Sequence, residues 1–244
     1  MSNVDPLWVD LDFNSPMAGC RASALVASLP LRAARVVDLG CGWAELLLRC
    51  VAAEPTATGV GVDTHEAAIT HGRSEAAARG LADRVTLQVG DAAAWSGEPA
   101  DVLLCVGASH AWGGTTQALA GLRTFVRPNG RLVFGEAFWT RPPTPEALQA
   151  LDADVDDYGS LADLVELAVG AGFRPIAVAE ASTDEWDSFE SRYAGAWERF
   201  LLTEADGAEA DEVRARADGH RARWLCGYRG VLGFAYLTLG VPSG

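Results

Sequence analysis

The stretch VVDLGCGWAELLLR, residues 36 to 49, decides the fold. It begins as a short apolar run, reaches Asp38, turns through Gly40 and Gly42, and continues in residues that favour a helix. Glycine accepts positive φ angles and lets the backbone approach a neighbour closely. A strand that passes through such a turn into a helix predicts a loop that brings the backbone close to a bound ligand.

The composition is that of a globular protein. The 244 residues include 33 acidic and 19 basic side chains, for a formal net charge of −14, and 49% of the residues are hydrophobic. An acidic surface repels phosphate backbones, so we expect no nucleic-acid partner. The five cysteines form no CxxC pair, the four histidines show no metal-binding spacing, and we expect no metal site. With no basic signal region and no apolar run of membrane-spanning length, the chain is expected to be cytoplasmic, without a membrane segment.

Strands and helices alternate over the first 140 residues. Short apolar runs predict five strands, at residues 34–40, 57–63, 84–91, 100–107 and 130–138. Helical patterns lie between them at 43–54, 64–80 and 115–130, the last ending in a Pro-Asn-Gly turn. This alternation predicts a parallel sheet with right-handed crossovers, in a doubly wound, Rossmann-like α/β fold.

Helical patterns dominate after residue 140. A helix over 160–172, a sixth strand over 173–181 and a final strand over 230–240 are expected. Between the last two strands, two sets of mainly aromatic or apolar residues recur at steps of three and four. Each set is expected to form a stripe on one face of a helix. They are Trp186, Phe189, Tyr193, Trp197 and Phe200, followed by Val213, Ala217, His220, Trp224 and Tyr228.

Two kinds of nucleotide cofactor compete for the glycine loop. The dinucleotide fingerprint GxGxxG needs a third glycine for tight packing of helix on strand, and Glu45 stands at that position here. A carboxylate in the first helical turn, with Asp38 just before the loop, disfavours a bound diphosphate. The loop therefore suits a ligand with an ammonium and a sulfonium, and a nicotinamide-dependent oxidoreductase is the less favoured alternative.

In these residues the chain resembles the class I S-adenosylmethionine-dependent methyltransferases. Their first motif, Asp/Glu-x-Gly-x-Gly-x-Gly, is matched by Asp38, Gly40 and Gly42, with Ala44 in place of the last glycine. That replacement removes freedom for a positive φ angle.

Further elements of the family follow in order over roughly residues 34–140. Asp63 ends the second strand, Asp91 follows the third, and RPNGRLVFGE at 127–136 corresponds to a Pro-Gly-Gly turn before the fifth strand. The resemblance implies a mostly parallel seven-stranded sheet with an antiparallel last strand and a helical lid.

The resemblance also implies that S-adenosylmethionine is the cofactor and that a defined set of residues binds it. These are Asp38, Gly40 and Gly42 at the methionine end, Asp63 at the ribose, Asp91 and Ala92 at the adenine, and in addition Thr64 and Val106.

The methyl acceptor is expected beside the loop after the fourth strand, residues 106–114. This loop has no Asn/Asp-Pro-Pro-Tyr motif, which is typical of enzymes that methylate DNA bases. His110 is the first candidate for acceptor-side catalysis, because histidine titrates near working pH, and Glu136 at the end of the fifth strand is the second. A small-molecule acceptor is expected, with its charge open because the acidic cluster at 152–159 and Arg141 give opposite indications.

The sequence thus predicts a single methyltransferase domain over residues 1–244 with five parts. Residues 1–30 are an N-terminal lid segment, 31–140 the cofactor-binding core, 141–172 and 182–229 helical insertions that cap the substrate, and 230–240 the last strand. A methyltransferase fold that binds S-adenosylmethionine without turnover remains an alternative, and a homodimer is left open.

Overall fold

The computed structural model describes residues 4–204 and 206–243, and they group into two compact units. The first unit comprises the described parts of 1–17, 138–160 and 181–233, and the second those of 18–137, 161–180 and 234–244. No helix among the described residues is both long and apolar enough to span a bilayer.

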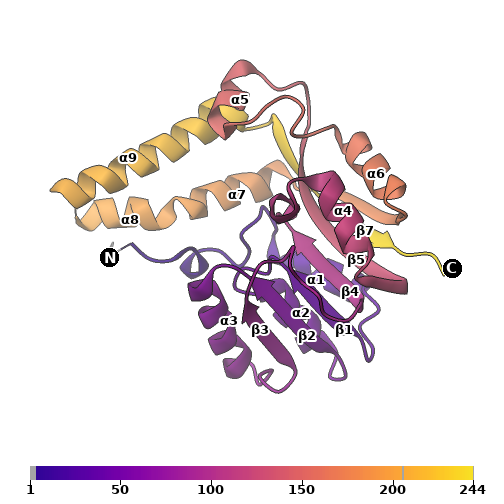
Figure 1. Cartoon of the computed structure of the whole chain (residues 1–244). Helices are drawn as coiled ribbons and strands as arrows, with labels where there is room; N and C mark the ends of the chain where they lie inside the picture. The colour runs from indigo at the N-terminus through magenta and orange to yellow at the C-terminus, as the bar shows by residue number, and fades with distance from the viewer. Residues whose placement is uncertain (1–3, 205, 244) are drawn as a thin grey trace. The chain divides into compact units, whose positions relative to one another are not determined.

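A seven-stranded sheet has the strand order β3-β2-β1-β4-β5-β7-β6 (Figure 1). The strands are β1 (Arg35–Leu39), β2 (Thr58–Asp63), β3 (Val85–Val89), β4 (Ala100–Val106), β5 (Val126–Trp139), β6 (Arg174–Glu180) and β7 (Leu232–Gly240). Neighbouring strands from β3 to β5 pair in parallel, while β6 and β7 pair antiparallel. The predicted fold class, a Rossmann-like and mostly parallel sheet with an antiparallel last strand, is confirmed.

Helices of the second unit cover this sheet and form its core. They are α1 (Gly19–Ser28), α2 (Glu45–Ala53), α3 (Glu66–Ala78), α4 (Thr115–Arg123) and α6 (Leu161–Gly170). The helix α2 shows how the sequence produces this packing. Its side chains Leu47, Leu48 and Val51 are fully buried, and the helix packs against β1 and β2. The parallel register brings the carboxyl ends of the strands to one edge of the sheet.

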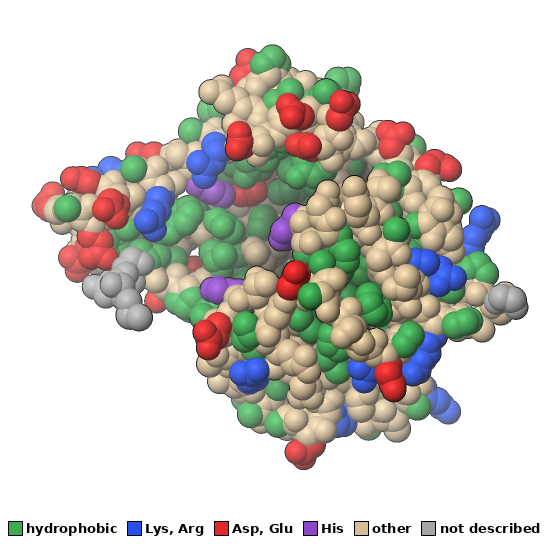
Figure 2. Space-filling view, in the orientation of Figure 1, with side chains coloured by type: hydrophobic (Ala, Val, Ile, Leu, Met, Phe, Trp, Pro, Cys, Tyr) green, Lys and Arg blue, Asp and Glu red, His purple; other side chains and the backbone are tan. Residues whose placement is uncertain are grey.

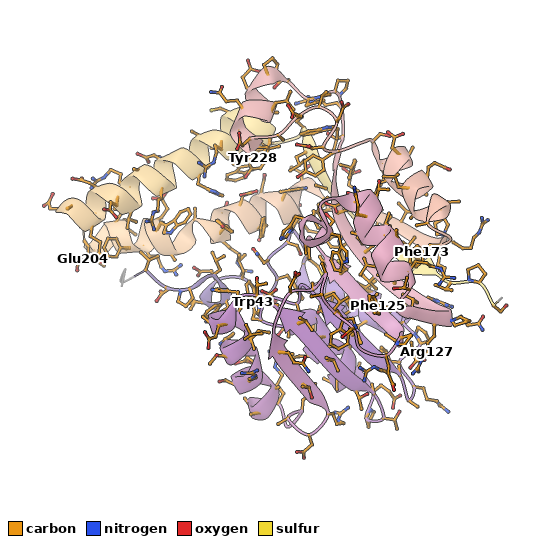
Figure 3. All side chains as sticks on the ribbon, viewed as in Figure 1. Trp43, Phe125, Arg127, Phe173, Glu204 and Tyr228 are labelled. Carbon is orange, nitrogen blue, oxygen red and sulfur yellow. The ribbon has the colours of Figure 1, made fainter. Side chains whose placement is uncertain are left out.

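One helix ends earlier than the sequence predicts. The pattern extends it to the Pro-Asn-Gly turn, but α4 ends at Arg123 and the turn lies within β5. Backbone hydrogen bonds explain the difference: the Ala100 N–H donates to Phe125, and the Asn129 N–H donates to Val241. Arg127, labelled in Figure 3, also forms an ion pair with Asp101 at 2.9 Å. The strand partners outweigh the local helical preference.

The first unit is mainly helical. It contains η1 (Leu7–Val9), α5 (Pro145–Leu151), α7 (Thr183–Tyr193), α8 (Gly195–Thr203), α9 (Ala208–Ala222) and the π-helical turn η3 (Arg223–Tyr228). The first aromatic stripe was expected on one helix, but the chain forms two helices, α7 and α8, which meet at Ala194 and Gly195. A capping box between Ser182 and Glu185 fixes the start of α7.

A buried carboxylate connects three elements of this unit. Glu190 on α7 is 3% exposed, accepts a hydrogen bond from the Tyr228 hydroxyl at 2.8 Å, and lies 2.9 Å from His220 Nε2. The Tyr193 ring stacks on His220, with 5.1 Å between ring centroids. The second predicted stripe, on α9 and η3, thus carries polar partners as well as packing residues (Figure 3 labels Tyr228).

Acidic side chains of this unit gather on its surface. Figure 2 shows them at the far end of α8 and α9 and over the segment after α5. In that segment Asp152, Asp154, Asp156 and Asp157 are exposed. The acidic cluster expected from the sequence is therefore largely solvated.

Candidate cofactor and acceptor site

The loop between β1 and α2 has the left-handed backbone that its glycines predict. Gly40 and Gly42 have φ angles of 82° and 54°. Ala44, in place of the family's third glycine, also has a positive φ of 65° as it caps α2. An alanine in this conformation costs roughly 1 kcal/mol relative to glycine, so the loop keeps the shape and loses some stability.

The two glycines of the loop serve different purposes. A Cβ atom on Gly40 would lie 2.2 Å from the Cβ of Ala108, so this residue lets the loop pack against the segment after β4. A Cβ atom on Gly42 would meet no atom within 4 Å. Gly42 therefore leaves open space beside the backbone, which is what a loop that approaches a ligand requires.

Backbone and carboxylate groups of β2 hold this loop. The N–H groups of Gly40 and Cys41 donate to the Val62 carbonyl at 2.9 and 3.1 Å. The N–H of Gly42 donates to Asp63 Oδ2 at 2.7 Å, and that of His65 donates to Oδ1 at 2.8 Å. A carboxylate oxygen can accept two hydrogen bonds, so Asp63 retains acceptor capacity for a ligand hydroxyl.

Asp38 is a buried acid next to this loop. It is 5% exposed and lies in β1, whose register with β2 pairs it with Gly61. Burial, and secondly the charge of Asp63, raise the pKa of Asp38 to about 8. A positively charged group placed here would compensate the buried carboxylate, whereas a phosphate would add repulsion.

The remaining predicted cofactor residues lie at the same edge of the sheet. Gly90, just before Asp91, donates its N–H to the Asp63 carbonyl at 2.9 Å, which places the end of β3 beside the end of β2. Asp91 is exposed and accepts from the Ala93 N–H at 2.9 Å. Of the others, Thr64 is exposed, Ala92 is buried and Val106 is half-buried.

Carboxylates and open glycine backbone fit the chemistry of S-adenosylmethionine. The cofactor presents an ammonium, a sulfonium, two ribose hydroxyls and an adenine amino group. Asp38, Asp63 and Asp91 supply acceptors at three successive strand ends, and Gly42 leaves the space. The residues present therefore fit this cofactor.

The acceptor-side candidates come together after β4. The short turn η2 (Ser109–Trp112) contains the exposed His110, and β4 and β5 pair Val106 with Gly135, the residue before Glu136. His110 lies near enough to Glu136 to lower its pKa, as a minor contribution. The side chains of Ser109 and Thr115 also lie close enough to the Glu136 carboxyl to lower its pKa, and sequence reasoning did not single out Thr115.

Glu136 is a buried carboxyl with one oxygen unused. The side chain belongs to a residue that is 5% exposed, and Oε1 accepts from the Ala137 N–H at 2.9 Å. Oε2 is buried and makes no well-aligned hydrogen bond within the described chain. Burial raises the pKa of Glu136, against the opposing effect of its hydrogen-bonding neighbours. Such an acid is suited to take up a proton or to bind a hydrogen-bond donor.

Comparison with known proteins identifies the family. A family model described as a methyltransferase domain matches residues 37–132. A crystal structure of an S-adenosylmethionine-dependent methyltransferase from Thiobacillus denitrificans, in complex with S-adenosylhomocysteine, is 30% identical, with 96% of this chain and 95% of that chain aligned and a TM-score of 0.85. The chain belongs to the S-adenosylmethionine-dependent methyltransferases.

Two further similarities agree with this assignment. A methyltransferase from Geobacter sulfurreducens, also solved with S-adenosylhomocysteine, is 28% identical, with 98% and 99% of the two chains aligned and a TM-score of 0.86. The uncharacterized protein YjhP of Escherichia coli is 29% identical over 208 residues, 84% of each chain. The chain thus matches these two proteins over 84% or more of their length.

The predictions of family, enzyme class and cofactor are confirmed by these comparisons. This methyltransferase uses S-adenosylmethionine as methyl donor. The nicotinamide-dependent alternative does not agree with the family. The roles of individual site residues stay predictions.

Proposed function

We propose that this methyltransferase acts on a small molecule whose hydroxyl or amine group donates a hydrogen bond to Glu136. The observation that carries this proposal is the buried, unpaired Oε2 of Glu136 at the end of β5. A buried oxygen without a hydrogen bond is destabilising, and an O–H or N–H group of the methylated small molecule would supply that hydrogen bond. The net charge of −14 further disfavours a nucleic-acid acceptor.

We assign the cofactor contacts along the sheet edge as the family motif implies. Asp38 and the glycine loop bind the methionine end, Asp63 the ribose and Asp91 the adenine. The support is the raised pKa of Asp38, which favours a cationic partner, and the spare acceptor capacity of Asp63. Thr64, Ala92 and Val106 complete the proposed set.

The bound cofactor supplies a methyl group on a positively charged sulfur. Transfer is an in-line displacement, so the protein mainly aligns the acceptor and handles its proton. Glu136 Oε2 accepts a hydrogen bond from the O–H or N–H of the small molecule. It takes that proton as the oxygen or nitrogen bonds to the methyl carbon, a step that the raised pKa of Glu136 favours. The exposed His110 then passes that proton toward solvent.

A test compares Glu136→Gln and His110→Ala with Glu98→Gln, a change at an exposed loop carboxylate. S-adenosylhomocysteine production is measured over a panel of small phenols, alcohols and amines, and cofactor affinity is measured by calorimetry. Glu136→Gln is expected to lower kcat/KM by about 100-fold or more and leave the cofactor Kd unchanged, while the control behaves as wild type.

The outcomes separate the competing functions. A Glu136→Gln variant that methylates the acceptor at the wild-type rate would overturn the acceptor assignment. Tight cofactor binding with no turnover over the whole panel would instead favour the alternative of a non-catalytic module that binds S-adenosylmethionine.

Location and substrate cap are further proposals for this methyltransferase. We propose a cytoplasmic location, because Cys20, Cys41, Cys50, Cys105 and Cys226 are all free thiols. The helical segments at 141–172 and 182–229 remain our proposed substrate cap.

A further inference from the structure

The residue that precedes α2 has a backbone conformation that its side chain disfavours. Ala44 has φ 65° and ψ 20°, in the left-handed region, and is fully buried. This region is unfavourable for alanine, because its Cβ atom comes too close to a carbonyl oxygen, whereas glycine adopts it without strain. Contacts around Ala44 must therefore hold its backbone in place.

Glu45, the first residue of α2, lies between two arginines. Its Oε1 accepts a hydrogen bond from Arg49 Nε at 2.7 Å, and its Oε2 forms an ion pair with Arg79 Nη2 at 2.7 Å. The Glu45 side chain is only 12% exposed, so salt and water screen these interactions less than those of a surface pair. Arg49 belongs to α2 itself, whereas Arg79 follows the end of α3, so the second pair joins the two helices. The charge of Glu45 is thus compensated within the protein.

The helix α3 contacts the same loop at a second place. A Cβ atom on Gly72 of α3 would lie 2.7 Å from the carbonyl oxygen of Trp43, so any side chain there would clash with the loop backbone. Gly72 and Arg79 are about two helical turns apart and therefore lie on nearly the same face of α3. Trp43, labelled in Figure 3, and Glu45 are the two neighbours of Ala44 in the chain. The helix thus supports the loop on both sides of the strained residue.

We propose that Glu45 is a positioning residue for S-adenosylmethionine. Through its ion pair with Arg79 it holds Ala44 in the left-handed conformation, and so stabilises a loop shape that a third glycine would adopt without strain. The Ala44 N–H donates to the Cys41 carbonyl at 2.8 Å, a hydrogen bond that closes the turn around Gly42. The position of Ala44 therefore fixes the open space beside Gly42. This inference rests on the proposed binding of the cofactor's methionine end by the loop.

Calorimetric titration of the full chain with two ligands tests this role. One is S-adenosylhomocysteine, and the other is methylthioadenosine, which lacks the amino-acid portion. Glu45→Gln keeps the size of the side chain and removes its charge. It is expected to raise the Kd for S-adenosylhomocysteine by roughly fivefold or more. The Kd for methylthioadenosine is expected to stay unchanged, because that ligand does not contact the loop through a methionine end.

The matched control removes the other carboxylate that is paired with Arg79. Glu75 forms an ion pair with Arg79 at 3.0 Å, within one turn of α3 and away from the loop. Glu75→Gln is therefore expected to bind both ligands as the wild type does. Circular dichroism checks that each variant is folded.

A second substitution removes the strain at its source. Ala44→Gly accepts the left-handed conformation freely, so the loop of this variant is expected to be independent of Glu45. Ala44→Gly with Glu45→Gln is expected to bind S-adenosylhomocysteine as tightly as Ala44→Gly alone, a coupling that a double-mutant cycle measures.

The outcomes separate the role of Glu45 from that of the loop. Wild-type affinity in Glu45→Gln, an equal loss for both ligands, or additive effects in the double variant would overturn the role of Glu45. Gly42→Ala tests the loop itself, and wild-type affinity for S-adenosylhomocysteine in that variant would overturn the assignment of the loop to the methionine end. Weak binding in Gly42→Ala together with wild-type binding in Glu45→Gln would overturn only the role of Glu45.

Discussion

The backbone N–H of Gly42 donates to Asp63 Oδ2 over 2.7 Å, so the acid that ends β2 also holds the glycine loop that follows β1. The second oxygen of Asp63 accepts from the His65 N–H at 2.8 Å. One carboxylate thus fixes two loops, and we assign to it a third task, binding the ribose. A change at Asp63 is therefore expected to affect both the shape of the loop and direct contacts with the cofactor.

Asp63→Ala is expected to raise the Kd for S-adenosylhomocysteine by roughly a hundredfold, because hydrogen bonds to a charged acceptor are lost on both the loop and the ligand. Calorimetric titration measures this change, with Asp83→Ala at an exposed loop position as the matched control. Wild-type affinity in Asp63→Ala would contradict the assignment of the ribose contact.

The buried Asp38 predicts cofactor binding that strengthens as pH rises toward 8. Because the pKa of Asp38 is raised to about 8, mainly by burial, the carboxyl is protonated at neutral pH without ligand. It must lose that proton to pair with the cofactor's ammonium. Below pH 8 the affinity is thus expected to rise by up to about tenfold per pH unit, measured by calorimetry at pH 6, 7 and 8.

The control for this pH effect is chemical as well as genetic. Asp38→Asn is expected to bind weakly and without the pH slope. Methylthioadenosine lacks the amino-acid portion of the cofactor, so its binding to the wild type is expected to show no such pH slope. A slope that persists in Asp38→Asn would mean that another group carries the proton.

The same raised pKa makes the stability of the free protein change with pH in the opposite direction to its cofactor affinity. The unfolded chain releases the Asp38 proton near pH 4, whereas the folded chain holds it to about pH 8. The native state therefore binds more protons between these values, and its stability without cofactor declines as pH rises through this window. Asp38 thus favours cofactor binding at a pH where it opposes folding of the free protein.

Much of this site could be predicted from the sequence because its acids recur at strand ends in a fixed order. Asp38, Asp63 and Asp91 each follow a recognisable apolar run, and parallel strands place such ends along one edge. The hydrogen bond from Gly42 to Asp63 could not be predicted, since it depends on the register of β1 against β2. The positive φ of Ala44 is likewise imposed by the turn, against the residue's own preference.

Other features could not be predicted from the sequence because they depend on contacts between distant segments. The early end of α4 follows from hydrogen bonds that residues near Asn129 make with neighbouring strands. The proximity of Thr115 to Glu136 is a second case, because Thr115 is about 20 residues away in the sequence and offers no periodic signal of its own.

The two loop glycines predict different failures on substitution. Gly42→Ala places a Cβ atom in open space and is expected to cost the free protein about 1 kcal/mol for its positive φ. It is also expected to weaken cofactor binding, because we assign this space to the cofactor. Gly40→Ala adds a clash with the Ala108 Cβ and is expected to lose about 3 kcal/mol or more of stability. Thermal unfolding and cofactor titration separate the two effects.

A second-site change checks the origin of the Gly40 effect. Ala108→Gly removes the atom with which the new Cβ would clash, so the pair Gly40→Ala with Ala108→Gly is expected to recover part of the lost stability. No recovery in the pair, or a melting temperature of Gly40→Ala equal to that of Gly42→Ala, would contradict this packing argument.

Glu190 is expected to be a major source of stability within the helical unit. It is the acceptor for the Tyr228 hydroxyl and lies 2.9 Å from His220 Nε2, and all three residues are buried. Glu190→Ala leaves both partners buried without that acceptor and is expected to cost about 3 kcal/mol. Glu198→Gln, which removes an exposed ion pair with Arg221, is expected to cost less than about 1 kcal/mol. Thermal unfolding of the two variants measures the difference, and equal losses would show that the buried carboxylate has no special structural weight.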